Sequence, residues 1–298
     1  VMLCRYKISR VGWGGNSDAF DRLHCPPPHP RTIFGRICRV LNLLILLVCS
    51  AEPSRSMSPS TLLGTGAGAP WSTRTVISGQ PWRRNGGRVR ITECLLDCRN
   101  GTEAGATRIG KVVADQGKRH LWSPRPTNRI DTVVIHYCSA VRVDRARRFS
   151  VPRIVLLLAE LGVSAHYLIS RHGGIFRLVP EQHSAWHCGP SVMPSPDLRN
   201  RVNDFSIGIE LVATDESGFT ESQYRSLGNL CTDIAIRRGP RLRFLGHEHV
   251  AGAEAVGRGL RNDAKSDPGP LFDWKRLAAN VRGLLSGKAS GVPMFPEG

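Results

Sequence analysis

The stretch DTVVIHY, residues 131–137, is an apolar run with the length and texture of a strand buried in a sheet. Segments of strand or helix character follow it along the chain. Strands are expected at 164–170, 174–180, 206–212 and 241–250, and helices at 149–162, 220–239 and 272–285. The glycine turn RHGG makes the first two of these strands a hairpin. Strands that alternate with helices, together with one hairpin, predict the α/β class: a mixed central β-sheet flanked by helices.

The helix expected at 220–239 has clear signals at both ends. Thr220 suits the N-cap position, and Gly239 suits the stop. The compact pattern as a whole runs from residue 126 to residue 288, and residues 289–298 are expected to form a tail. Residues 52–125 are rich in Ser, Gly, Thr, Pro and Arg with little periodicity, which predicts an irregular or linker segment.

Residues 1–51 form a doubtful leader that contains a possible secretory signal. Two arginines precede the apolar run Val40–Val48, which is too short for a stable membrane span but suits a signal peptide. Cleavage after Ala51 is one expectation, and lipid attachment at Cys49 is the alternative. Residues 1 to about 35 are interpreted as upstream translation, because a signal normally begins its chain. The interpretation favours a secreted, periplasmic or lipid-anchored protein over a cytoplasmic one.

The chain is strongly basic, with 41 Lys and Arg against 24 Asp and Glu and a net charge of +17. A nucleic-acid partner is one explanation of that charge. The basic residues are scattered, however, and no aromatic ladder runs between them, so no nucleic-acid partner is expected. The charge also suits an anionic polymer such as a bacterial cell wall.

Nine cysteines are present, of which four lie in the leader. The other five have no regular spacing, which argues against a disulfide framework and a zinc ribbon. Cys138 and Cys188 are interpreted as small packing residues.

Ionisable residues gather in GHEHVAGAEAVGRGLRNDAKSDPGP, residues 246–270. If the strand expected at 241–250 continues through them, His247 and His249 point to one side and Glu248 to the other, so the pattern leaves either histidine possible as a ligand. His136, at the end of VVIH, is the best first ligand for a catalytic zinc site, which needs three ligands and one open position. Asp267, in the stiff turn KSDPGP, can aim a carboxylate at it.

Five ordered blocks carry a resemblance to a known family: VVIH (133–136), VSAHYLISRHGGIFRLVPEQHSAWHCGPS (163–191), NDFSIGIELVATD (203–215), GH (246–247) and KSDPGPLFDW (265–274). Together they resemble the zinc-dependent N-acetylmuramoyl-L-alanine amidases, which share a fold with peptidoglycan recognition proteins. The nearest in texture are the anhydro-muropeptide amidases of cell-wall recycling. The resemblance implies that residues 126–288 are a zinc amidase domain that acts on peptidoglycan or muropeptides.

The resemblance implies a role for each matching residue. One Zn²⁺ would be held by His136, His247 and Asp267. Glu210 and Lys265 would be catalytic, and His187 would contact the substrate. Glu210 also stands out without the family, because a carboxylate in an apolar strand is costly to desolvate unless it is paired or functional.

Two points are left open by the sequence. His247 and Asp267 are separated by a longer loop than in the recycling enzymes, which puts strict specificity for anhydro-muropeptides in doubt. A secreted enzyme would digest wall polymer, whereas a cytoplasmic one would recycle fragments. The alternative function is that of a non-catalytic peptidoglycan-binding protein on the same fold, and the sequence does not indicate an oligomeric state.

Overall fold

A computed structural model describes residues 74–78, 89–97, 101–102, 105–106, 108–286 and 293–296. The leader and the proposed signal at 36–51 lie outside these residues. The strands are β1 (Arg74–Ser78), β2 (Val89–Glu93), β3 (Gly101–Thr102), β4 (Gly105–Ala106), β5 (Trp122–Pro124), β6 (Thr132–Cys138), β7 (Tyr167–Ile169), β8 (Ile175–Arg177), β9 (His183–Ala185), β10 (Ser206–Val212) and β11 (Arg243–Gly246). The helices are α2 (Arg108–Asp115), α3 (Val151–Glu160), the 3₁₀ helix η1 (Val202–Phe205), α4 (Glu221–Arg238), α5 (His247–Ala251), α6 (Ala253–Gly257) and α7 (Trp274–Leu285).

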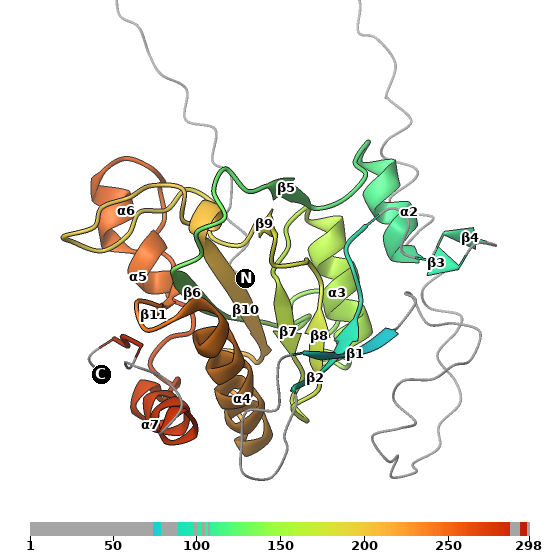
Figure 1. The fold of residues 1–298 in the computed structure, drawn as a ribbon. Coiled ribbons are helices and arrows are strands. Elements are labelled where there is room, and N and C mark those ends of the chain that lie inside the picture. Colours follow the sequence, from blue (N-terminus) through green and yellow to red (C-terminus); the bar gives the residue numbers. More distant parts are fainter. Residues whose placement is uncertain are drawn as a thin grey trace, which may run out of the picture. The chain divides into compact units, whose positions relative to one another are not determined.

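The main sheet has the strand order β1-β2-β8-β7-β10-β6-β11 (Figure 1). Its centre is parallel: β6 pairs with β10 and β11, and β10 pairs with β7, all in the same direction. β7 and β8 pair antiparallel as the expected hairpin, and β1 pairs antiparallel with β2. The prediction of a mixed sheet flanked by helices is confirmed.

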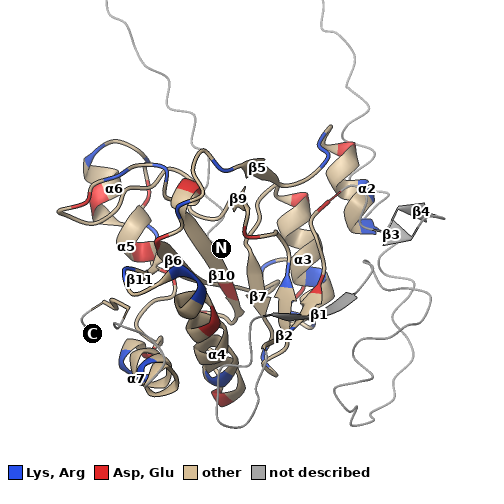
Figure 2. Ribbon diagram, in the orientation of Figure 1, with Lys and Arg blue, Asp and Glu red and all other residues tan. Residues whose placement is uncertain are grey.

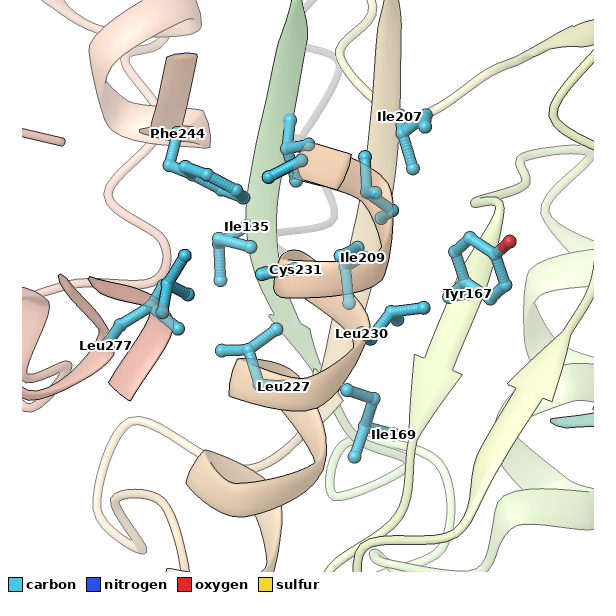
Figure 3. Close-up of a cluster of buried hydrophobic side chains, with 14 of the residues drawn as sticks. Ile135, Tyr167, Ile169, Ile207, Ile209, Leu227, Leu230, Cys231, Phe244 and Leu277 are labelled. Carbon is cyan, nitrogen blue, oxygen red and sulfur yellow. The ribbon is translucent and has the colours of Figure 1, made fainter. Parts of the chain in front are cut away.

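The two faces of the sheet bury different cores. One core lies between the strands and helices α4 and α7, where Leu227, Leu230 and Cys231 of α4 face Ile135 and Ile209 (Figure 3). The apolar residues of α4 recur every three or four positions, so they form one stripe that covers the sheet. Thr220 caps this helix with a reciprocal bond to Gln223, and Gly239 ends it, as predicted.

The opposite face is covered by α2 and α3. Ile109 and Val113 of α2 pack with Ile154 and Leu158 of α3 in a second core. This finding corrects the prediction that residues 52–125 are irregular: for the residues described there, α2 belongs to this core and β1 and β2 belong to the main sheet. The segment of β2 has too few apolar residues to be recognised as a strand from its sequence. It forms a strand because it pairs with β8.

The last strand is shorter than predicted. β11 ends at Gly246, and His247–Ala251 form the helix α5 where the sequence pattern predicts strand. The long loop then forms α6 and returns, because Lys265 N donates to Ala251 O at 2.9 Å. Residues 252–264 therefore leave and re-enter at one point, so the length of this loop does not displace Asp267.

Charged residues are distributed over several helices and loops, with acidic residues among the basic ones (Figure 2). The described cysteines Cys94, Cys138, Cys188 and Cys231 are all free and buried. Within the described part of the chain, the structure contains no helix whose length and apolar character would let it cross a bilayer.

Candidate metal centre

His136 and Glu210 lie side by side on neighbouring parallel strands. They are register partners in the β6–β10 pair, so their side chains leave the same face of the sheet. Ile135 and Ile209, one position earlier, point to the opposite face and into the core beneath α4. The alternation of each strand therefore fixes two polar side chains next to each other, away from that apolar core.

Asp267 reaches this point from a turn that packs against the end of β11. A side chain at Gly246 would place its Cβ only 2.6 Å from Pro268 Cδ, so the close approach of the turn requires glycine there. Two hydrogen bonds hold the turn: Glu248 N donates to Asp267 O at 2.9 Å, and Gly269 N donates to Glu248 Oε2 at 3.1 Å. The carboxylate is thereby carried on a fixed backbone.

Three predicted ligands converge in the folded chain. His136 Nδ1 lies 3.1 Å from Asp267 Oδ2, and His247 Nδ1 lies 3.1 Å and 3.2 Å from the two carboxylate oxygens. Both imidazoles are buried, and the Asp267 side chain is 15% exposed. One ligand atom from each residue can be chosen so that all three lie within 4.8 Å of one another, which is a suitable arrangement for one metal ion.

The structure separates the two histidines of GHEH. Because they begin a helix and do not continue a strand, His247 and His249 point to different sides. His249 Nδ1 accepts a hydrogen bond from Gly246 N at 2.8 Å, and its ring meets Trp274 edge to face. His249 is therefore held away from the cluster, while His247 is turned into it.

The electrostatics of the cluster favour a bound cation. Burial would raise the pKa of Asp267, but the adjacent imidazoles of His136 and His247 hold it well below its usual range. Burial, together with the neighbouring His247, lowers the pKa of His136 to about 4, so this ring is neutral at physiological pH. These two shifts leave an ionised, largely buried carboxylate against at least one uncharged imidazole, and a buried charge of this kind requires compensation.

Glu210 is the second unusual carboxyl group. Burial, followed by the negative charge of Asp267, raises its pKa to about 7. Its Oε2 atom is buried without a hydrogen-bond partner, and the Cys138 thiol bonds to the carboxyl group. Cys138 also packs in the second core, as its interpretation from the sequence expects. A proton on Glu210 is weakly enough held to be exchanged near neutral pH.

A groove of about 190 Å³ lies against the cluster. Asp267 and Lys265 line it at one side, and Tyr137, Thr214 and Asp215 are among its other walls. The groove brings Lys265 to the same surface as Asp267, which the sequence pattern alone does not establish.

His187, the residue predicted to contact substrate, lies buried next to His136. Its ring is buried behind His136, with Nδ1 at 3.0 Å from His136 Nε2 and Nε2 at 3.2 Å from Ser206 Oγ. Burial and the nearby histidines lower its pKa well below the usual value, so the ring is neutral. The ring nitrogens therefore face protein groups.

Sequence reasoning missed Ser206 and Asn203, which surround His187. Their signal is the polar start of NDFSIGIEL, where hydrophilic residues lead directly into a buried strand. That signal is weak, because polar residues commonly precede strands in turns.

Comparisons with known proteins agree with this site. Residues 126–270 match the family model described as N-acetylmuramoyl-L-alanine amidase. The 1,6-anhydro-N-acetylmuramyl-L-alanine amidase AmpD of Citrobacter freundii is 43% identical over 126 residues, which is 42% of this chain and 60% of that protein.

Two solved structures are also similar. A selenomethionine AmpD derivative is 34% identical with a TM-score of 0.43, over 54% of this chain and 89% of the other. AmiD of E. coli, in complex with anhydro-N-acetylmuramic acid-L-Ala-D-gamma-Glu-L-Lys, is 30% identical with a TM-score of 0.39, over 54% of this chain and 65% of the other. The similarity to this family is supported by the sequence identities and not by the structural superpositions.

The expectation of a secreted, periplasmic or lipid-anchored protein is wrong. It depends on residues 36–51, which the structure does not describe. The curated relatives at 36% to 43% identity are 1,6-anhydro-N-acetylmuramyl-L-alanine amidases. These relatives, and not the proposed signal, decide against the expectation of an exported protein.

Proposed function

Residues 126–270 of this chain belong to the N-acetylmuramoyl-L-alanine amidase family, and we propose that the protein is a zinc hydrolase that cleaves the amide bond between N-acetylmuramic acid and L-alanine in muropeptides. One observation carries the proposal: two imidazole Nδ1 atoms meet the Asp267 carboxylate, with Glu210 on the neighbouring strand to His136. The proposed cellular role of the protein is the recycling of cell-wall fragments.

The hydrogen bonds of His247 support a metal ion at this point. Its Nε2 lies 3.1 Å from the carbonyl oxygen of Cys188, an atom that can only accept, so Nε2 carries the hydrogen. In a neutral ring Nδ1 then presents a lone pair to the Asp267 carboxylate at 3.1 Å. Two acceptors at that distance repel unless a cation lies between them.

The donor set suits zinc. Two histidine nitrogens and one carboxylate oxygen are ligand types of catalytic zinc sites, which keep a further position open. Metal–ligand distances of about 2.0 Å in a tetrahedral site separate the ligand atoms by about 3.3 Å, close to the 3.1 Å observed here. Bound zinc supplies a Lewis acid and lowers the pKa of water to about 7.

Glu210 is proposed as the general base and acid. Its pKa of about 7 lets it take a proton from the attacking water and return it to the leaving amine of L-alanine. The Cys138 thiol forms a hydrogen bond with the Glu210 carboxyl group. The Oε2 atom of Glu210 has no hydrogen-bond partner, so it is available to accept a proton from water.

Lys265 is proposed to stabilise the negative charge that develops on the carbonyl oxygen. It shares the groove with Asp267, and its backbone is fixed by the hydrogen bond to Ala251. Preorganised positive charge close to a developing oxyanion is a large part of such catalysis. The buried position of His187 argues for a supporting role and not for substrate contact.

Mass spectrometry of the reaction products tests the activity. The full chain is incubated with 1,6-anhydro-N-acetylmuramyl tripeptide and, separately, with intact sacculi. We expect release of the stem peptide from the soluble fragment, loss of release with a chelator, and recovery with zinc. No release from either substrate by zinc-loaded protein would contradict the enzyme and favour the non-catalytic peptidoglycan-binding alternative. Cleavage of sacculi alone would contradict the recycling role.

A matched pair of variants tests the ligand assignment. His247→Ala should lose the bound zinc, whereas His249→Ala should keep one ion per chain, because His249 caps α5 and contacts Trp274, away from the cluster. Zinc content is measured by atomic absorption after dialysis. Equal loss in both variants would contradict the assignment of His247.

A further inference from the structure

His187 and Cys188 lie directly behind both candidate histidine ligands. The His187 ring contacts His136, and the Cys188 carbonyl contacts His247. We propose that this pair is a positioning support that holds both histidines as Nδ1 ligands. The inference rests on the proposed function, because it takes His136 and His247 to be the zinc ligands.

The hydrogen bonds that set the tautomer of His187 begin at a backbone carbonyl. Ser206 Oγ lies 2.6 Å from Val202 O, which can only accept, so the single hydroxyl proton of Ser206 is directed there. Ser206 Oγ must then accept from His187 Nε2, 3.2 Å away. Nε2 therefore carries the proton of the neutral His187 ring, and Nδ1 is left with its lone pair.

The same series of hydrogen bonds continues from His187 to the candidate ligand His136. His187 Nδ1, now an acceptor, faces His136 Nε2 at 3.0 Å, so His136 donates from Nε2. The remaining nitrogen of His136, Nδ1, is left with its lone pair and faces Asp267. A chain of contacts that starts at Val202 thereby selects the tautomer in which His136 can bind a metal. Outer groups of this kind orient metal-binding histidines.

The second histidine is held by the backbone of the same segment. The Cys188 carbonyl accepts from His247 Nε2 at 3.1 Å, which leaves His247 Nδ1 free for the metal. Asn203 fixes this segment, since its Oδ1 accepts from Cys188 N at 2.9 Å and from His187 N at 3.3 Å. One side chain of η1 thus sets the position of the support for both ligands.

The neighbouring strand makes room for the His187 ring. A Cβ at Gly208 would lie 2.5 Å from His187 Cγ and 2.6 Å from its Nδ1. Glycine at this position of β10 is therefore needed for the ring to pack behind His136.

A competing arrangement uses the same atoms differently. Cys188 Sγ also lies 3.1 Å from His187 Nδ1, and His136, His187 and Cys188 form a second group that could hold a metal. A metal there would take His136 through Nε2 and remove it from the Asp267 cluster. The two arrangements differ in whether sulfur binds the metal, so they can be distinguished by spectroscopy.

The test measures metal affinity in variants of the full chain. His187→Leu removes the acceptor, and we expect zinc affinity, measured by competition with a chromophoric chelator, to fall about 10- to 100-fold. His187→Asn places an amide oxygen where Nδ1 stood and should restore most of it. Ser206→Ala should give a smaller loss than His187→Leu. The cobalt-substituted wild type should show no thiolate charge-transfer band.

His166 provides the matched control. It is also a fully buried histidine, with its ring 5.7 Å from that of His187, but it bonds Gly208 N and His183 O and neither candidate ligand. His166→Leu should lower the melting temperature without changing the zinc affinity of the folded protein.

The outcomes separate the two proposals. If the wild type binds no zinc, both the proposed function and this inference fail. If it binds zinc and His187→Leu binds it equally well, or if His166→Leu loses as much affinity, the positioning role alone is refuted. A strong cobalt–thiolate band would instead place the metal at Cys188. If His187→Leu does not fold, the comparison of Ser206→Ala with wild type decides the role.

Discussion

Replacing Glu210 by Gln should stabilise the metal-free protein at alkaline pH while it removes the hydrolytic activity. Glu210 is 6% exposed, and burial followed by the charge of Asp267 raises its pKa from 4.5 to about 7. The folded state therefore prefers the protonated carboxyl group. Glutamine has nearly the same shape and cannot ionise, so the variant avoids the cost of a buried charge.

The size and sign of the effect follow from the two pKa values. Below pH 4.5 Glu210 is protonated in the folded and unfolded states, and the substitution should have little effect. Between pH 4.5 and 7 the unfolded state releases the proton first, so the wild-type free energy of unfolding falls as the pH rises. Above pH 7 the full cost applies, which is about 3 kcal/mol at about 1.4 kcal/mol for each pH unit.

Urea unfolding of the full chain, followed by circular dichroism with a chelator present, measures this difference. The advantage of Glu210→Gln over the wild type should grow by about 3 kcal/mol from pH 4.5 to pH 8. Glu216→Gln is the control, because Glu216 is exposed and follows the same strand. If the difference in free energy of unfolding between Glu210→Gln and the wild type does not change with pH, Glu210 does not carry a destabilising buried charge, whatever the activity shows. Hydrolysis should fall about 10²- to 10⁴-fold, the usual contribution of general acid–base catalysis.

Three further perturbations probe the fold around the site. Gly208→Ala would place Cβ 2.5 Å from the His187 ring, so we expect a loss of about 1–3 kcal/mol in stability and weaker zinc binding; an unchanged chelator titration would contradict this. Burial would raise the pKa of Glu181, but Arg237, Arg238 and Tyr167 lower it to about 2, so its stabilisation is present above pH 4.5 and lost as the pH falls through 2. Glu181→Gln should reduce the loss of unfolding free energy as the pH falls below 4.5. If acid unfolding has the same pH dependence in the variant, the ion pairs of Glu181 do not stabilise the fold. Leu227→Ala should cost about 2–5 kcal/mol in urea unfolding without changing zinc affinity, because Leu227 is fully buried on the face opposite the site.

The sequence by itself determined the central strands of the sheet and the candidate residues for a metal centre. Apolar runs and caps are local, so Thr220 and Gly239 bound a helix wherever it packs. The pairing of β6 with β10, which places His136 and Glu210 on one face, is tertiary. The family motifs add His247 and Asp267 as candidates, although no local pattern distinguishes His247 from His249.

Only the tertiary structure decided how these residues meet. α5 begins at His247 because the Asp267 turn packs against Gly246 and bonds Glu248, a contact between segments twenty residues apart. The ring of His187 packs on Gly208 and lies behind His136, and β2 is part of the sheet through its pairing with β8. Such choices depend on distances between segments that no short window of sequence contains, since each hydrogen bond and close approach here needs both partners in place.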